Sequence, residues 1–504
     1  MIKTAQKWLA CVSRLVICAS AVAVSSPGTA GPAAVSGPSA PRNVSAPAAA
    51  RRPNILVIIM DDLGYADVSA YHRGRIPTPN IDRIARDGAL FRQGYVSAPI
   101  CSPSRAGLMT GRHQQRFGFE YNNGPGRLDQ AEHRGLDPRE RTLADVLKAG
   151  GYRTGAIGKW HLGWNDEHYP TNRGFDHFWG LLTGQTNFIR PDAPTAVNAF
   201  PPSRPGDGRE LAQPYQVVAP TEQIVTGPTR TVVDMGDRHM TEVMTDEALR
   251  FIDAGGDQPF FLYLAHNAPH TPLQTTREWY DRFAHIPNTT QRVYAAMVAM
   301  ADHQIGRVLN HLEAKGLAQN TVVVLLSDNG CAAYIPDLCS AEPLAGGKLT
   351  YLEGGVRVPF MMRWPGKVRP GQTVDRPVSS LDIFPTAVAA AGLRLPADRD
   401  YDGMDLVAQL KTTKARPPLF WRTSPMAAVR QGDWKYVRDA NGQELLYNLK
   451  ADPGETRNLI SSDAAQADLM RSAHAAWSAK MVNPLWKPRT TEFSFGGRSF
   501  KFLP

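Results

Sequence analysis

The chain has 504 residues, of which 42% are hydrophobic and 20% charged, and its formal net charge at pH 7 is +9. This composition excludes a chain that is disordered throughout, and the length is enough to bury a large core. The positive charge is modest, so it is compatible with a polyanionic ligand but does not require one.

The amino-terminal end is typical of a secretory signal peptide. Two lysines precede an apolar run, residues 8–24, which is interrupted only by Arg14, and Gly28-Thr29-Ala30 resembles a cleavage site. The run is too short and too broken to cross a bilayer, and no other stretch approaches the ~18 apolar residues of a spanning helix. A disordered tail and a lipid anchor at Cys18 are the alternatives. We expect residues 1–30 to be removed from a periplasmic or secreted protein.

Residues 31–52 are rich in proline, alanine, serine and valine, so they are predicted to be a disordered linker. Because residues 1–30 contain three basic residues and no acidic one, the mature chain would carry a net charge of about +6.

Three short apolar runs are typical of strands that are buried on both faces. They are residues 54–60, 260–265 and 321–326. Helical patterns lie among them, at residues 142–149, 241–252 and 291–316. Strands that alternate with helices predict an α/β fold with a large, mostly parallel central sheet flanked by helices. We expect this main domain to span residues 53–395.

A polar cluster follows each of the three apolar runs at once. The clusters are Asp61-Asp62, the segment from His266 to His270, and Asp328-Asn329. Ligands of open α/β sheets bind beyond the carboxyl ends of the strands. The sequence therefore predicts that these clusters meet at one edge of one sheet.

The composition changes near residue 395 to short alternating runs. They occupy residues 427–430, 434–438 and 444–449. Asn441-Gly442 is a strong signal for a hairpin between the last two. We expect residues 396–504 to form a smaller α+β subdomain with an antiparallel sheet.

Asp61 and Asp62 are adjacent carboxylates, which repel each other at the end of a buried strand unless a cation joins them. A pair of aspartates that caps a turn is the alternative, and Gly64 supports it. Asp328 and Asn329 supply further oxygen ligands from a second strand end. Oxygen ligands without cysteine or histidine favour Ca²⁺ or Mg²⁺ over Zn²⁺.

Cys101-Ser102-Pro103-Ser104-Arg105 begins a predicted helix, and Pro103 suits its first turn. The N-terminus of a helix presents free N–H groups and a positive dipole to an anion. Arg105 lies one turn on, where its side chain could bond residue 101 or a bound anion. A buried structural cysteine is the alternative, but it leaves Pro103 and Arg105 unexplained.

Three further residues or pairs are candidates for binding an anion or moving a proton. Lys159 and His161 lie two apart on a segment that is expected to be extended, so their side chains would point the same way. His270 follows the second apolar run, and Lys348 lies in a glycine-rich loop without P-loop spacing. The alternative is that these residues are surface lysines and structural histidines.

Taken in order, these motifs resemble those of one family. Cys-x-Pro-x-Arg at Cys101 resembles the maturation signature of type I sulfatases, which belong to the alkaline phosphatase superfamily. Other segments resemble that family too: residues 158–163, 170–176, 346–359, 432–436 and 452–455. The resemblance extends from Pro53 to Leu459 and is to bacterial arylsulfatases and enzymes similar to N-acetylgalactosamine sulfatases.

The resemblance implies a sulfuric ester hydrolase with the alkaline-phosphatase-like sulfatase fold. A maturation enzyme would oxidise Cys101 to formylglycine, whose hydrate attacks sulfur. One Ca²⁺ ion, or less readily Mg²⁺, would be held by residue 101 together with Asp61, Asp62, Asp328 and Asn329. The other implied catalytic residues are Arg105, Lys159, His161, His270 and Lys348, of which Lys159, His270 and Lys348 would also bind the substrate.

A secreted, mildly basic sulfatase is expected to act on a sulfated oligo- or polysaccharide. Gln185 and Asn187, the region 117–137 and the proline-rich insertion 192–238 are candidates for the pocket wall. A phosphomonoester or phosphonate-monoester hydrolase of the same superfamily is the alternative activity, and a glycan-binding relative without activity is another. The sequence identifies neither the sugar nor the oligomeric state, and we expect no nucleic-acid partner.

Cysteine usage agrees with export. Of the five cysteines, two lie in the predicted signal peptide and Cys101 belongs to the motif above. Cys331 and Cys339 are expected to form a disulfide in an oxidising compartment, with two free loop thiols as the alternative.

Overall fold

The computed structural model describes residues 51–72, 76–124, 130–199, 223–335 and 337–487, and the backbone of two later strands, β20 (Thr491–Phe495) and β21 (Arg498–Phe502). The predicted signal peptide and nearly all of the predicted linker lie outside these residues. Residues 51–504 cluster as one unit, so the boundary expected at residue 395 stays a prediction. Among the described residues, no helix has the length and apolarity that crossing a membrane requires.

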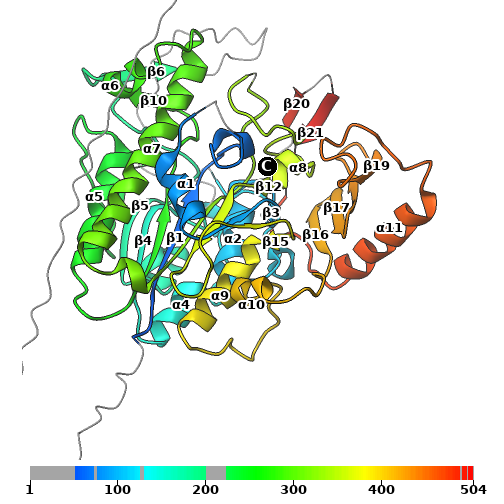
Figure 1. Ribbon diagram of the computed structural model, residues 1–504, viewed down its shortest axis with the longest axis horizontal. Helices are drawn as coiled ribbons and strands as arrows, with labels where there is room; N and C mark the ends of the chain where they lie inside the picture. Colours follow the sequence, from blue (N-terminus) through cyan, green and yellow to red (C-terminus); the bar gives the residue numbers. More distant parts are fainter. Residues whose placement is uncertain are drawn as a thin grey trace, which may run out of the picture. The chain divides into compact units, whose positions relative to one another are not determined.

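A ten-stranded sheet forms the centre of the molecule (Figure 1). Its five middle strands run parallel to one another: β11 (Thr321–Ser327), β1 (Asn54–Met60), β9 (Phe260–Ala265), β4 (Arg153–Lys159) and β5 (His177–Leu181). Outside β11 lie β13 (Phe360–Arg363), β2 (Ala89–Phe91) and β14 (Gln372–Val374), and outside β5 lie β7 (Val225–Thr226) and β8 (Thr231–Val232). The three predicted strands are confirmed and are neighbours.

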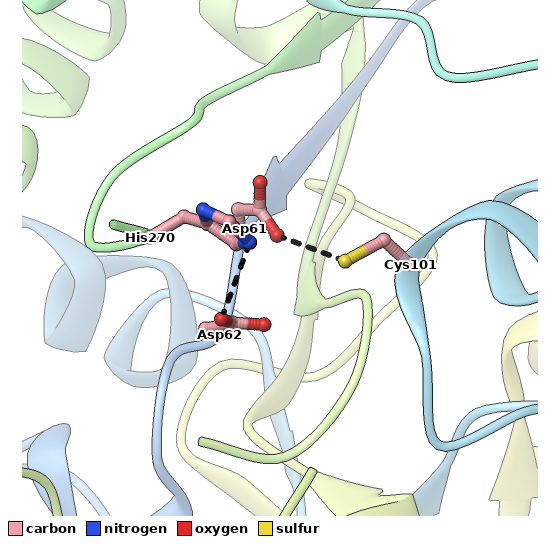
Figure 2. A group of neighbouring side chains, drawn as sticks. All are labelled: Asp61, Asp62, Cys101 and His270. Carbon is pink, nitrogen blue, oxygen red and sulfur yellow. Dashed lines mark hydrogen bonds and ion pairs between the residues drawn. The ribbon is translucent and has the colours of Figure 1, made fainter. Parts of the chain in front are cut away.

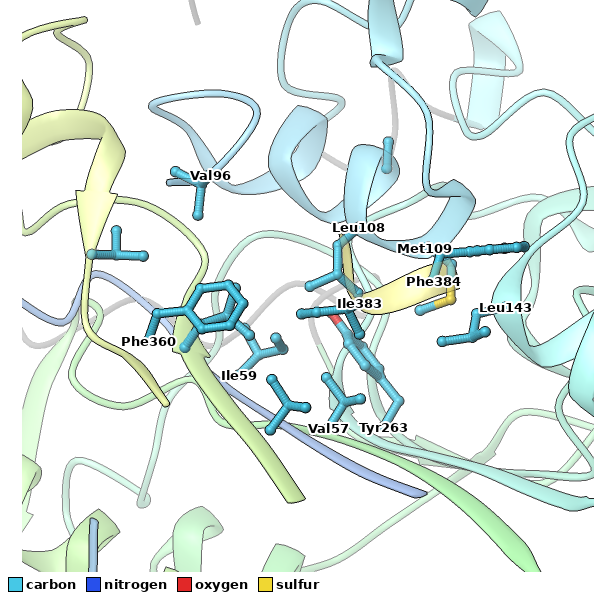
Figure 3. Packing of buried hydrophobic residues seen from close by; sticks show 14 of the residues in the cluster. Val57, Ile59, Val96, Leu108, Met109, Leu143, Tyr263, Phe360, Ile383 and Phe384 are labelled. Carbon is cyan, nitrogen blue, oxygen red and sulfur yellow. The ribbon is translucent and has the colours of Figure 1, made fainter. Parts of the chain in front are cut away.

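Both faces of the sheet are buried, as the continuous apolar runs predicted. Ile55, Val57 and Ile59 of β1 belong to one core cluster, whereas the alternate residues of β1 belong to a second cluster on the opposite face. The first face packs against α2 (Cys101–Thr110), α4 (Leu143–Ala149) and α9 (Ile383–Ala390), as Figure 3 shows. The second packs against α1 (Pro79–Arg86), α5 (Met240–Asp253) and α7 (Thr289–Ala314).

The register of the parallel strands brings the polar clusters to one level. Met60 pairs with Ser327, and Ile59 pairs with Ala265. Gly158 of β4 also pairs with Ala265. The residues that follow these positions therefore leave the sheet at the same carboxyl edge.

The carboxyl-terminal part contains an antiparallel sheet, as predicted. Its strands are β16 (Leu419–Thr423), β17 (Met426–Gln431), β18 (Trp434–Arg438) and β19 (Glu444–Asn448), and α11 (Ala464–Ser478) packs on it. The turn at Asn441-Gly442 joins β18 to β19. The sequence analysis did not single out β16.

Cys331 and Cys339 form a disulfide in the structure, with their Cα atoms 6.1 Å apart. It lies in the loop that follows β11 and Asp328-Asn329.

Candidate active site

The ends of three strands and the start of one helix bring the predicted catalytic residues together. Asp61 and Asp62 follow β1, Asp328 and Asn329 follow β11, and Lys159 ends β4. Figure 2 shows the Asp61 carboxylate turned toward the thiol of Cys101, the first residue of α2, and the His270 ring beside Asp62.

Two lysine ammonium groups lie directly on the adjacent carboxylates. Lys159 Nζ is 2.6 Å from Asp61 Oδ2. Lys348 Nζ is 2.7 Å from Asp62 Oδ1 and 2.9 Å from Asp62 Oδ2. Asn329 Nδ2 also donates to Asp62 Oδ1, over 2.6 Å. The repulsion between the two aspartates is thus relieved by cations, as the sequence analysis required.

Arg105 lies among the carboxylates, and its predicted contact with a modified residue 101 or a bound anion stays a prediction. Its Nε donates to Asp328 Oδ2 over 2.8 Å, and a second guanidinium nitrogen lies 2.7 Å from the same oxygen. Its third nitrogen donates to the backbone oxygen of Lys159 over 2.8 Å. Arg105 is 1% exposed, so it acts as an internal cross-link between β11 and β4.

The donor set could hold a divalent cation, and it includes a cysteine and a histidine besides the oxygen ligands that the sequence predicted. Asp61, Asp62, Cys101 and His270 each offer a ligand atom, all within 4.8 Å of one another. Asn329 Oδ1 is buried and accepts no hydrogen bond from the described residues. An unpartnered buried oxygen beside three carboxylates is costly unless a cation binds it.

The charges of the group show what a bound cation would change. The group contains three carboxylates, Asp61, Asp62 and Asp328, and three permanent cations, Arg105, Lys159 and Lys348. Burial and the negative charge of Asp61 raise the pKa of Asp328 to about 6, so Asp328 is still ionised at neutral pH. The group is therefore close to neutral, and a divalent cation would make it attractive to an anion.

The Cys101 thiol is a poor nucleophile in this setting. It is 1% exposed, and burial raises its pKa to about 12 although two lysines lie nearby. The thiolate is the reactive form of cysteine, so a thiol held neutral at pH 7 has little reactivity.

His161 is placed to accept a proton. The expectation of an extended backbone is wrong here, since His161 has a φ of 57°. Its Nε2 lies 3.1 Å from the backbone oxygen of Asn123, which can only accept, so Nε2 holds the proton of the neutral ring. Burial, with Lys159 and Arg105 nearby, puts the pKa of His161 well below its usual value. Nδ1 has no partner among the described residues, so its lone pair is free.

His270 marks the open side of the cluster. Its Nδ1 lies 2.6 Å from the backbone oxygen of Thr271, and its Nε2 lies 3.6 Å from Asp62 Oδ2. Its side chain is 11% exposed, compared with 6% or less for Lys348, Lys159 and Cys101. A ligand would therefore approach from the side of His270.

Comparison with known proteins identifies the family. A model described as Sulfatase matches residues 53–393, and one described as N-sulphoglucosamine sulphohydrolase, C-terminal, matches residues 347–479. The chain belongs to the sulfatase family. This sulfatase is therefore a sulfuric ester hydrolase, as its motifs predicted.

Relatives of this sulfatase act on different sulfate esters. The N-acetylgalactosamine-6-sulfatase of Homo sapiens is 34% identical over 396 residues, which cover 76% of this chain and 71% of that protein. The steryl-sulfatase of Homo sapiens is 32% identical over 428 residues, covering 73% of this chain and 71% of that protein. Family membership alone thus does not select the substrate.

Solved structures share the fold over most of the chain. Ps i-CgsB in complex with k-i-k-neocarrahexaose has a TM-score of 0.76 and 32% identity, covering 86% of this chain and 95% of that chain. The phosphonate monoester hydrolase of Agrobacterium radiobacter has a TM-score of 0.60 and 21% identity, covering 90% of this chain and 100% of that chain. The second likeness shows the fold alone.

The sequence analysis placed residues 117–137 in the pocket wall but did not predict that Asn122 and Asn123 support Cys101 and His161. Asn122 Oδ1 accepts from the backbone N–H of Ser102 over 3.1 Å, and Asn123 Oδ1 accepts from the Ser102 hydroxyl. Ser102 Oγ also lies 2.6 Å from the backbone oxygen of His161. Trp486, in the carboxyl-terminal segment, donates from Nε1 to the backbone oxygen of Asn122 over 3.3 Å. Isolated polar residues in a loop do not indicate such hydrogen bonds in the sequence.

The predicted pocket wall lies close to His161. A Cβ added to Gly184 would lie 3.0 Å from His161 Cε1, so this segment packs on the ring. Gln185 is exposed, and Asn187 lines a cavity of about 580 Å³. Contact of Gln185 and Asn187 with substrate stays a prediction. Parts of the regions 117–137 and 192–238 lie outside the described residues.

Proposed function

We propose that this sulfatase hydrolyses sulfate esters of a carbohydrate, with a nucleophile made from Cys101 by oxidation to formylglycine. The observation that carries this proposal is the buried neutral thiol among three carboxylates and three cations at the edge of the sheet. A relative that acts on an N-acetylgalactosamine sulfate and a similar structure solved with a neocarrahexaose support a carbohydrate substrate.

Formylglycine would supply what a thiol or a single hydroxyl cannot. Its hydrate has two hydroxyl groups, so one can take the sulfuryl group and the other can lose a proton to expel sulfate. His161 is suited to take that proton, because Nδ1 is unprotonated and unpartnered in the neutral ring. The maturation enzyme that this chemistry requires is part of the proposal.

We propose that Asp61, Asp62, Asp328 and Asn329, together with residue 101, hold one Ca²⁺ ion. When bound, the ion would acidify a coordinated hydroxyl and attract the oxygens of the sulfate group. Its oxygen ligands favour calcium or magnesium over zinc, and the buried Asn329 Oδ1 is an acceptor that such an ion would use.

Lys159 and Lys348 would bind the sulfate oxygens on the side of the ester opposite to its alcohol. Their ammonium groups lie on Asp61 and Asp62, so a bound cation would free them to turn toward an anion. His270 lies at the open side and is our candidate to protonate the leaving oxygen. Burial lowers the pKa of His270, and the charges of Asp61 and Asp62 oppose that shift.

The test is release of inorganic sulfate from a panel of sulfated mono- and oligosaccharides, with matched phosphate esters alongside. The protein is co-expressed with a formylglycine-generating enzyme, and Cys101→Ala is the blank. We expect sulfate from at least one glycan and none from the blank. Faster release of phosphate than of sulfate would favour the phosphohydrolase alternative.

We also propose that the protein is exported after cleavage behind Ala30. The basic and apolar amino-terminal pattern supports export. The amino-terminal peptide of the exported protein should then begin at Gly31. A cell-associated protein that retains residues 1–30 would contradict this.

A further inference from the structure

A second charged cavity lies outside the active site. Its volume is about 490 Å³, and its wall combines loops of the main sheet with the turn between β17 and β18. Four cationic side chains line it: Arg376, Lys414, Arg416 and Arg430. The acidic side chains in the wall are Asp375 and Asp433, so positive charge predominates.

Two of the four cations, Arg376 and Lys414, form no ion pair with the described carboxylates. Arg376 donates to the backbone oxygens of Gln409 and Thr412, which are neutral acceptors. Lys414 is exposed and forms no ion pair with the described residues. Arg416 forms an ion pair with Asp382. Asp375 of the cavity wall lies 3.3 Å from Arg92, which is not part of the wall.

Arg430 is the buried member of the group. It is 4% exposed and donates to the Tyr95 hydroxyl and to Gln93 Oε1, both neutral. A guanidinium that is held by neutral acceptors keeps its full charge and a fixed orientation. The cavity thus has a rigid cationic floor and, at Lys414, a flexible cationic rim.

Two residues of the cavity wall follow strands that end at the same edge of the sheet as the active site. Leu326 pairs with Phe360, and Met361 pairs with Leu90, so β2 runs in the same direction as β11. β14 is parallel to β2. Gln93 and Arg376, which follow these strands, leave the sheet where Asp328 does. With strands about 4.8 Å apart, two or three strand spacings place the cavity about 10–15 Å from Asp328.

We propose that this cavity binds a second sulfate or carboxylate group of the same carbohydrate chain whose sulfate ester occupies the active site. The proposal rests on the proposed function. Arginine binds such planar or tetrahedral oxyanions through paired N–H groups. No aromatic side chain is among the described residues of the wall, so the site favours a charged substituent over the face of a neutral sugar. Binding at two points would make longer, multiply charged substrates bind more tightly than small ones.

The test compares two lysines three residues apart. Lys414→Glu places a negative charge at the rim of the cavity, and Lys411→Glu makes the same change at an exposed position outside its wall. For a multiply sulfated oligosaccharide, we expect Lys414→Glu to raise KM by about three- to tenfold at low salt, with less effect at high salt. Hydrolysis of a small aryl monosulfate should be unchanged. Equal effects of the two variants, or none, would overturn the proposal.

A binding measurement separates failure of this site from failure of the proposed function. Calorimetry on the inactive Cys101→Ala protein, with and without Lys414→Glu, uses the same oligosaccharide and needs no turnover. We expect Lys414→Glu to weaken binding by about three- to tenfold, and Arg376→Gln to weaken it as well. If no sulfate ester is hydrolysed but binding still depends on Lys414, the activity is wrong and the anion site stands. If hydrolysis occurs and binding ignores both substitutions, the anion site is wrong.

Discussion

Two buried charged clusters in this molecule look alike in composition but differ in how their atoms are used. The first cluster is the active site, and the second surrounds Lys435 of β18. Lys435 lies 2.8 Å from Glu353 Oε1 and 3.0 Å from Glu455 Oε1. Glu353 Oε2 accepts from the Tyr95 hydroxyl over 2.6 Å, and Glu455 Oε2 accepts from the backbone N–H of Glu353 over 2.6 Å. Three of the four carboxylate oxygens accept hydrogen bonds from the protein, and the fourth, Glu455 Oε1, has an ion pair with Lys435 as its contact among the described residues.

The active-site cluster, by contrast, leaves atoms without a protein partner. Asn329 Oδ1 and His161 Nδ1 are buried and unpartnered among the described residues. The His270 side chain of this cluster is 11% exposed. A buried ion pair is weak evidence for function by itself. Unpartnered atoms directed into a cluster of charges distinguish a site that binds a ligand from one that joins two parts of a fold.

Replacing one lysine in each cluster by methionine should lower activity in the active-site cluster and stability in the Lys435 cluster. Lys159→Met removes a cation that faces the sulfate, so we expect kcat/KM for a sulfate ester to fall by about 10²–10³-fold. Lys435→Met removes the cation that Glu353 and Glu455 share and leaves Glu353 with Arg357 alone, so we expect a loss of about 3–5 kcal/mol in unfolding free energy. Activity of the Lys435 variant below its melting temperature should change little. Denaturant unfolding and steady-state kinetics are measured for both variants. A loss of activity in Lys435→Met together with a loss of stability alone in Lys159→Met would contradict the roles assigned to the two clusters.

Added Ca²⁺ should also distinguish the clusters. Asn329→Leu removes an oxygen ligand at nearly constant volume, and we expect Ca²⁺ affinity to fall by about 10–100-fold. Calcium should raise the melting temperature of the unaltered protein and of Lys435→Met, but much less that of Asn329→Leu at the same concentration. A calcium titration followed by thermal unfolding makes the comparison. Equal shifts in all three proteins would mean that the ion binds elsewhere.

The Lys435 cluster should respond to pH in a defined direction. Burial and the charge of Glu353 raise the pKa of Glu455 to about 7, above its value of about 4.5 when exposed. The folded state then binds more protons than the unfolded state, so this group's contribution to stability is lost as the pH rises from about 4.5 to 7. Glu455→Gln cannot ionise and should flatten the profile in that range. A profile that keeps the same slope in the variant would assign the titration to another group.

The smallest expected effect concerns the carboxyl-terminal segment. Trp486→Phe keeps a ring against Phe119 but removes the hydrogen bond to Asn122. We expect kcat to fall by about two- to tenfold with KM nearly unchanged, because the loop beside Cys101 and His161 loses one support. Trp477→Phe is a suitable control, since Trp477 stacks on Phe420 away from this loop. An equal change in both variants would indicate a general loss of stability.

Much of the fold and of the site followed from the sequence because each signal was local. The runs at 54–60, 260–265 and 321–326 are apolar along their whole length, which only strands buried on both faces require. Polar residues that follow parallel strands must meet at one edge, so the pattern of residues alone was enough to place Asp61 and Asp328 together.

What the sequence could not predict depends on contacts between distant segments. Trp486 and Asn122 are 364 residues apart, and neither letter indicates the other. The bonds of Arg105 to Asp328 and to the Lys159 backbone oxygen also join segments that are far apart in the sequence. The left-handed backbone at His161 likewise depends on tertiary packing that local pattern does not reveal.

The most direct test of the account is the mass of the tryptic peptide that contains residue 101, measured on preparations of graded sulfatase activity. The account predicts that part of this peptide carries an aldehyde in place of the thiol, and that specific activity rises in proportion to that fraction. Full activity in a preparation whose residue 101 is entirely unmodified cysteine would contradict it.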